Sequence, residues 1–112
     1  MTTPGDLIIA VDLVGIASLF GLGLFCLISK ANLIKMVIGV ELMGKAVTLS
    51  FILGGFLNGN VGLSQGVVFT IIAIEAVVAA LALALAIIGR GSFDTLDVEK
   101  ISDIAAQEAK RE

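Results

Sequence analysis

Residues 38–51 read IGVELMGKAVTLSF, an apolar run that carries two charged side chains, Glu41 and Lys45. A charged side chain at the centre of a membrane helix costs about 2.5–3.5 kcal/mol on insertion scales, so a charge at that depth usually serves a function. The next apolar run carries a third such residue, Glu75. This stretch therefore decides both the class of the fold and the place where a function is to be sought.

The composition is typical of an integral membrane protein. Of the 112 residues, 58% are hydrophobic and 15% are charged, whereas a soluble domain is about half apolar and a quarter charged. The formal net charge of −3 comes mainly from the polar ends and does not indicate a nucleic-acid partner. Histidine is absent and Cys26 is the single cysteine, which excludes an internal disulfide and argues against a Cys/His metal site.

Three apolar runs are long enough to cross a hydrocarbon core of about 30 Å as helices. They occupy approximately residues 7–29, 33–55 and 67–88. Polar breaks separate them at Lys30-Ala31-Asn32 and at Asn58-Gly59-Asn60, the second extended over residues 62–65. The sequence therefore predicts an all-α membrane protein, with a three-helix transmembrane domain at residues 1–89 and a tail at residues 90–112.

The basic residues predict the orientation. Lys30 and Lys35 follow the first run, Arg90 follows the third, and the break after the second run has no basic residue. Both basic segments fall on one side of a three-span protein, and the positive-inside rule makes that side cytoplasmic. We therefore expect the N-terminus outside. Residues 1–6 lack a basic segment, so no cleaved signal peptide is expected.

The cytoplasmic tail is predicted to contain a short helix. Asp97 is a suitable N-cap residue. Beyond it, apolar residues recur at helical spacing and share one face: Val98, Ile101, Ile104 and Ala105.

The three membrane charges are predicted to lie at similar depth. Counted from the cytoplasmic ends at 1.5 Å per residue, Glu41 is about 12 Å deep, Lys45 about 18 Å and Glu75 about 20 Å. Glu41 and Lys45 are four residues apart, on one helix face. Two structural interpretations stay open. The first two residues could form a static ion pair, and Glu75 could be a protonated carboxyl bonded to a neighbouring helix.

The functional interpretation is a relay of protons or ions through Glu41, Lys45 and Glu75. A low dielectric favours the neutral form of a carboxyl group and a nearby ammonium favours the charged form, so a balanced site can load and release a proton. Thr48 and Thr70 are accessory candidates, as is Asp12, about 8 Å below the outer end of the first run. No residue is predicted to be catalytic.

At these residues the chain resembles a known family. The segment NLIKMVIGVELMGKAVTLSF resembles the second helix of subunit K of NADH:quinone oxidoreductase, respiratory complex I. That family has an Ile-Gly-x-Glu core and a membrane glutamate on each of helices two and three, which Glu41 and Glu75 match. The resemblance implies a small subunit that relays charge between antiporter-like membrane subunits of a redox-driven complex.

Two features depart from that pattern. Lys45 stands where the family more often has an uncharged residue. The segment SQGVVFTIIAI, with Gln65 and Thr70, is more similar to MrpC, a small membrane component of Mrp-type cation/proton antiporters. Such mixed features would suit membrane-bound hydrogenases and other ferredoxin-linked relatives of complex I. A stand-alone Mrp antiporter is therefore the alternative.

The resemblance also implies what the subunit lacks and where it lies. No cofactor or metal is expected in this chain, which is not an enzyme by itself, and the expected location is the plasma membrane. Two further interpretations are disfavoured. A rotor-ring subunit of an ATP synthase usually has an even number of spans and one acid per hairpin, and three buried charges argue against a purely structural scaffold.

Overall fold

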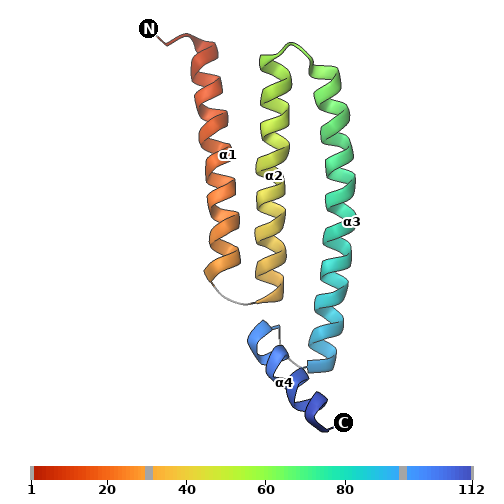
Figure 1. The fold of residues 1–112 in the computed structure, drawn as a ribbon. Coiled ribbons are helices and arrows are strands. Elements are labelled where there is room, and N and C mark those ends of the chain that lie inside the picture. Colours follow the sequence, from red (N-terminus) through yellow and green to blue (C-terminus); the bar gives the residue numbers. More distant parts are fainter. Residues whose placement is uncertain (1, 30–31, 94–95, 112) are drawn as a thin grey trace.

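The computed structural model describes residues 2–29, 32–93 and 96–111. These residues form four helices, with no strand beyond one isolated bridge. The helices are α1 (Pro4–Ser29), α2 (Leu33–Leu57), α3 (Val61–Phe93) and α4 (Val98–Arg111). The three long helices stand antiparallel in a single layer with α2 in the middle, and α4 lies at the end where α3 finishes (Figure 1). The molecule is thin for its length, 68 × 28 × 17 Å.

Three helices are long and apolar enough to span a membrane. The spans are Pro4–Ser29, Leu33–Leu57 and Val61–Gly91. With 25 residues, the shortest of them rises about 38 Å at 1.5 Å per residue, which exceeds a hydrocarbon core of about 30 Å. The prediction of an all-α protein with three membrane helices is therefore confirmed.

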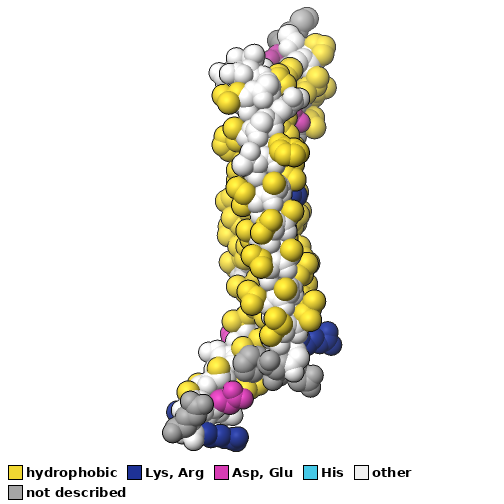
Figure 2. Space-filling model, turned by 90° about the vertical axis from the view of Figure 1, so that its right-hand side faces the viewer, with side chains coloured by type: hydrophobic (Ala, Val, Ile, Leu, Met, Phe, Trp, Pro, Cys, Tyr) yellow, Lys and Arg dark blue, Asp and Glu magenta, His cyan; other side chains and the backbone are white. Residues whose placement is uncertain are grey.

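Most of the apolar surface is not covered by the chain itself. Within the described residues, four hydrophobic side chains are buried, those of Ala46, Leu53, Val68 and Ala86. Figure 2 shows hydrophobic side chains along the whole shaft, with charged ones mainly towards its ends. A contiguous apolar surface of this extent suits lipid or neighbouring membrane subunits and does not suit water.

The contact between α1 and α2 depends on two glycines. A Cβ atom on Gly23 would lie 2.7 Å from the carbonyl oxygen of Gly39, and one on Gly39 would lie 2.7 Å from the carbonyl oxygen of Gly23. Small residues allow membrane helices to approach with their backbones in contact. This glycine pair therefore fixes how closely α1 and α2 pack.

The break between α2 and α3 is shorter than predicted. Its expected extension over residues 62–65 is wrong, because α3 already includes them. The polar side chains there serve the helix: Asn60 Oδ1 accepts a hydrogen bond from Leu63 N (3.3 Å), and Ser64 Oγ donates one to Phe51 O (2.6 Å). Local polarity therefore marked a helix start and a helix–helix contact, not a loop.

At the opposite end, the first polar break is described only from Asn32, since Lys30 and Ala31 lie outside the described residues. Asn32 Oδ1 accepts hydrogen bonds from Ile34 N (3.0 Å) and Lys35 N (3.3 Å), and so caps α2. Lys35 near the start of α2 and Arg90 in the last turn of α3 lie at this same end (Figure 1). The side of the membrane that this end faces stays a prediction.

The helix of the tail is confirmed, and its N-cap is Asp97. The Oδ1 atom of Asp97 accepts hydrogen bonds from Glu99 N (3.0 Å) and Lys100 N (3.2 Å). Leu33 N donates to Leu96 O (3.0 Å), which ties the segment before α4 to the start of α2. On the predicted apolar face, Val98, Ile101 and Ile104 are half-buried and Ala105 is exposed. Helix α3 runs to Phe93, past the expected end at residue 88.

Candidate functional site

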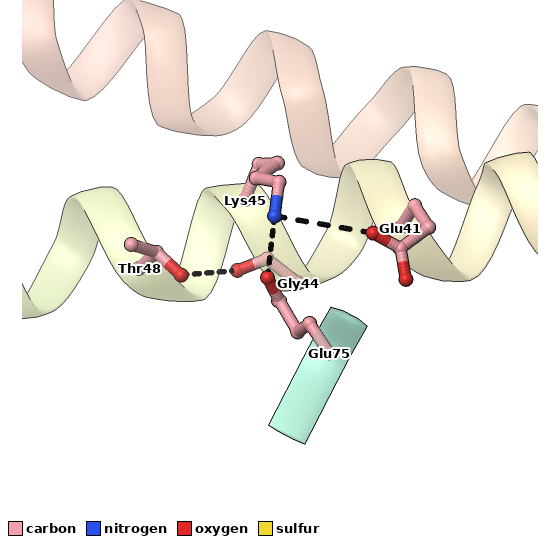
Figure 3. Close-up of polar contacts among 5 residues, drawn as sticks. All are labelled: Glu41, Gly44, Lys45, Thr48 and Glu75. Atoms are coloured by element: carbon pink, nitrogen blue, oxygen red, sulfur yellow. Dashed lines mark hydrogen bonds and ion pairs between the residues drawn. The ribbon is translucent and has the colours of Figure 1, made fainter. Parts of the chain in front are cut away.

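Three charged side chains meet between α2 and α3: Glu41, Lys45 and Glu75, called the charge triad below. Lys45 Nζ lies 2.5 Å from Glu75 Oε2 and 3.9 Å from Glu41 Oε2. Figure 3 shows the lysine between the two carboxylates, with Glu75 reaching across from α3. The structure therefore brings together the three residues that the sequence singled out as a relay.

The charge triad lies in the middle of the membrane-spanning segments. Lys45 is the central residue of α2, which runs from Leu33 to Leu57, and Glu75 is next to the midpoint of the span Val61–Gly91. At this depth an unpaired charge is costly, and pairing with an opposite charge is the common way to hold it there. The pairing therefore explains how the chain tolerates three charges in its spans.

The pairing within α2 follows from local helix geometry, whereas the pairing to α3 does not. Glu41 and Lys45 are at positions i and i+4, which face each other on any α-helix. Glu75 has no basic residue nearby on its own helix, and the sequence suggested a protonated carboxyl as its structural interpretation. The structure instead gives Glu75 an ammonium partner from α2.

The members of the triad differ in exposure. The side chain of Glu75 is 13% exposed, that of Glu41 28% and that of Lys45 46%. With all three ionised, two carboxylates face one ammonium, which leaves one negative charge in excess. The site is therefore closed on the side of Glu75 and open on the side of Lys45, where there is room for a neighbouring subunit to complete it.

The carboxylate of Glu75 uses its two oxygens differently. Oε2 accepts the hydrogen bond of Lys45, while Oε1 is buried with no hydrogen-bond partner among the described residues. Buried polar atoms without partners are rare in native structures and often mark a site of function or of a missing ligand. Oε1 lies over Gly44 of α2, where an added Cβ atom would overlap it. Sequence reasoning missed Gly44, although a glycine beside Lys45 was a readable signal for a close approach.

The accessory candidates are not part of the triad. The Thr48 hydroxyl is buried and donates to Gly44 O (3.0 Å), one turn from Lys45 (Figure 3). Thr70 donates to Gly66 O (3.0 Å) within α3. Asp12 is exposed on α1. Within the described parts of the chain, no ion pair or hydrogen bond joins Thr70 or Asp12 to the triad.

Residues 2–29, 32–93 and 96–111 hold no group of three or more His, Cys, Asp or Glu side chains arranged for a metal ion. Cys26 is a free, half-buried thiol. The expectation that this subunit binds no cofactor stays a prediction.

The fold and the triad define a class: a small multi-pass α-helical membrane protein with paired charges at mid-membrane depth. The sequence model of the family "NADH-ubiquinone/plastoquinone oxidoreductase chain 4L" matches residues 12–105. The chain belongs to this family, and it is a small membrane subunit of the NADH-quinone oxidoreductase type. The resemblance to subunit K is confirmed.

Individual relatives agree with this assignment. The chain is 36% identical over 85 residues to NADH-quinone oxidoreductase subunit K of Chlorobaculum tepidum, covering 74% of this chain and 77% of the relative. It is 38% identical over 80 residues to subunit K 2 of Syntrophobacter fumaroxidans, covering 69% of each. It is 39% identical over 71 residues to subunit K 1 of Citrifermentans bemidjiense, covering 62% and 67%. No solved structure matches the chain significantly.

Proposed function

We propose that this subunit relays protons or sodium ions within a redox-driven complex related to complex I. The observation that carries the proposal is the charge triad: one ammonium held between two carboxylates from two helices, at the middle of the membrane. Electron transfer takes place in other subunits, and this chain holds no cofactor of its own.

The geometry supports charge transfer by exchange of partners. An ammonium group has three N–H donors and can serve both carboxylates. When a proton neutralises Glu75, Lys45 loses its nearer counter-charge at 2.5 Å and the carboxylate of Glu41, at 3.9 Å, becomes its partner. Loading at one carboxylate thus changes the proton affinity of the other, which is the coupling that a relay requires.

The exposed side of the triad is where the relay continues into other subunits. Lys45 is nearly half exposed at a depth where lipid cannot solvate an ammonium. We therefore place antiporter-like membrane subunits against this side of α2, with the complex in the plasma membrane, the N-terminus outside and α4 in the cytoplasm.

A second candidate function is that of MrpC in a stand-alone Mrp-type antiporter. The sequence feature that favours it is the spacing of Gln65 and Thr70 at the start of α3. Both candidates use the charge triad, and they differ in whether electron transfer drives it.

Affinity purification of the tagged subunit from native membranes separates the two candidates. Co-purification of redox subunits together with antiporter-like subunits is the expected result. Antiporter subunits alone would assign the chain to the Mrp branch. The relay itself is tested by the charge-neutral substitutions Glu41→Gln and Glu75→Gln.

A further inference from the structure

Gly44 is the position on α2 over which the Glu75 carboxylate lies. An added Cβ atom at Gly44 would overlap Glu75 Oε1 and would lie 2.9 Å from Glu75 Cδ and 3.6 Å from Glu75 Cγ. The missing side chain leaves a gap in the surface of α2, called the Gly44 notch below. Glu75 reaches Lys45 through this notch.

The other tight glycines in the chain meet different atoms. Added Cβ atoms at Gly23 and Gly39 would meet backbone carbonyl oxygens of the facing helix, and one at Gly55 would meet Ser64 and the backbone of Asn60. Backbone atoms cannot swing away, so these glycines are needed for helix packing. The Gly44 notch faces only the end of a flexible side chain, which could move aside. Helix packing alone therefore does not require a glycine at position 44.

The notch also sets the state of each carboxylate oxygen. It allows Oε2 to reach Lys45 Nζ, and it keeps Oε1 buried without a hydrogen-bond donor among the described residues. Oε1 is thus the free acceptor of the carboxylate. A proton that binds there converts the carboxylate to a neutral acid and leaves Glu41 as the remaining counter-charge of Lys45.

We infer that Gly44 is a positioning residue of the relay, whose missing side chain holds the Glu75 carboxylate on Lys45 with one oxygen free. This inference rests on the proposed function and adds a residue that acts through another. The charged groups that face Glu75 are Lys45 and Glu41, both from α2; within the described residues, no ion pair links α1 to the site.

Gly44→Ala in the intact complex tests the inference. The Glu75 carboxylate should swing out of the notch and leave Lys45, while the helices stay packed. Assembly should therefore match wild type, and the pH profile of ion translocation should move by about 1–3 pH units, the range expected when a carboxylate loses an adjacent opposite charge. Gly54→Ala is the matched control on the same helix, because an added Cβ atom there meets nothing within 4 Å.

The double variant Gly44→Ala/Lys45→Met separates positioning from a general structural effect. If Gly44 acts only through the bond between Glu75 and Lys45, the double variant has the same pH profile as Lys45→Met alone. Additive shifts would overturn the inference, as would a Gly44→Ala profile equal to that of Gly54→Ala. Loss of assembly in Gly44→Ala would overturn it too, since Gly44 would then be a packing residue.

The result is distinguishable from a failure of the proposed function. If Glu75→Gln lowers ion translocation but Gly44→Ala behaves as the control does, the relay stands and only the positioning role of Gly44 falls. If Glu75→Gln and Glu41→Gln both translocate ions at the wild-type level, the relay itself falls.

Discussion

Lys45 and Glu75 form an ion pair that joins α2 to α3 at mid-membrane depth, with 2.5 Å between Nζ and Oε2. The two residues are thirty positions apart in the chain. Because Lys45 also faces Glu41 at 3.9 Å, the pair is part of a three-membered site with an excess of negative charge. A static lock between helices and a relay both fit this geometry, and substitutions of the charged residues separate them.

Lys45→Met removes the ammonium and keeps much of the side-chain volume. If Lys45 tunes the two carboxylates, the pH profile of ion translocation shifts by about 1–3 pH units. The measurement is the initial rate of translocation against pH in sealed vesicles that contain the intact complex.

Lys35→Met is the control for Lys45→Met, since Lys35 is on the same helix and its ammonium lies 5.9 Å from the centre of the Phe25 ring, away from the triad. Its profile should match wild type. An unchanged profile in Lys45→Met would favour the static ion pair over the relay.

Gly39→Ala should weaken the packing of α1 on α2. The new methyl group would lie 2.7 Å from the backbone oxygen of Gly23, and overpacking of this kind costs about 1–3 kcal/mol. We expect less assembled subunit and a lower thermal midpoint in detergent. Gly21→Ala, where the new methyl group meets nothing within 4 Å, should behave like wild type. Equal stability of the two variants would contradict the role of the glycine pair.

The orientation of the chain is tested with a protease that cleaves the tail around α4. In vesicles of known sidedness, cleavage should occur only from the cytoplasmic face, because Lys35 and Arg90 lie at the same end as α4. Cleavage from the outer face alone would reverse the predicted topology.

The sequence predicted what depends on local rules. The spans follow from the length of the apolar runs, the contact between Glu41 and Lys45 from the i, i+4 spacing, and the start of α4 from the cap at Asp97. Each of these needs only residues that are neighbours along one helix.

The contacts between helices could not be predicted in this way. The bond of Lys45 to Glu75 depends on the register of α3 against α2, which the Gly44 notch and the contact of Ser64 with Phe51 help to set. For the same reason, the local pattern around Ser64 indicates a loop, although its hydroxyl bonds to α2. Polar residues between apolar runs mark a turn or a helix contact equally well in the sequence.

The number of ions translocated per electron tests the central claim most directly. Glu41→Gln and Glu75→Gln each remove a proton-binding carboxylate while conserving shape. The measurement compares each variant complex with wild type in sealed vesicles, with assembly and electron transfer followed in parallel. We predict normal assembly and a fall in translocation of at least about tenfold, as expected when a group that transfers protons is lost. Undiminished translocation per electron in both variants would contradict the relay.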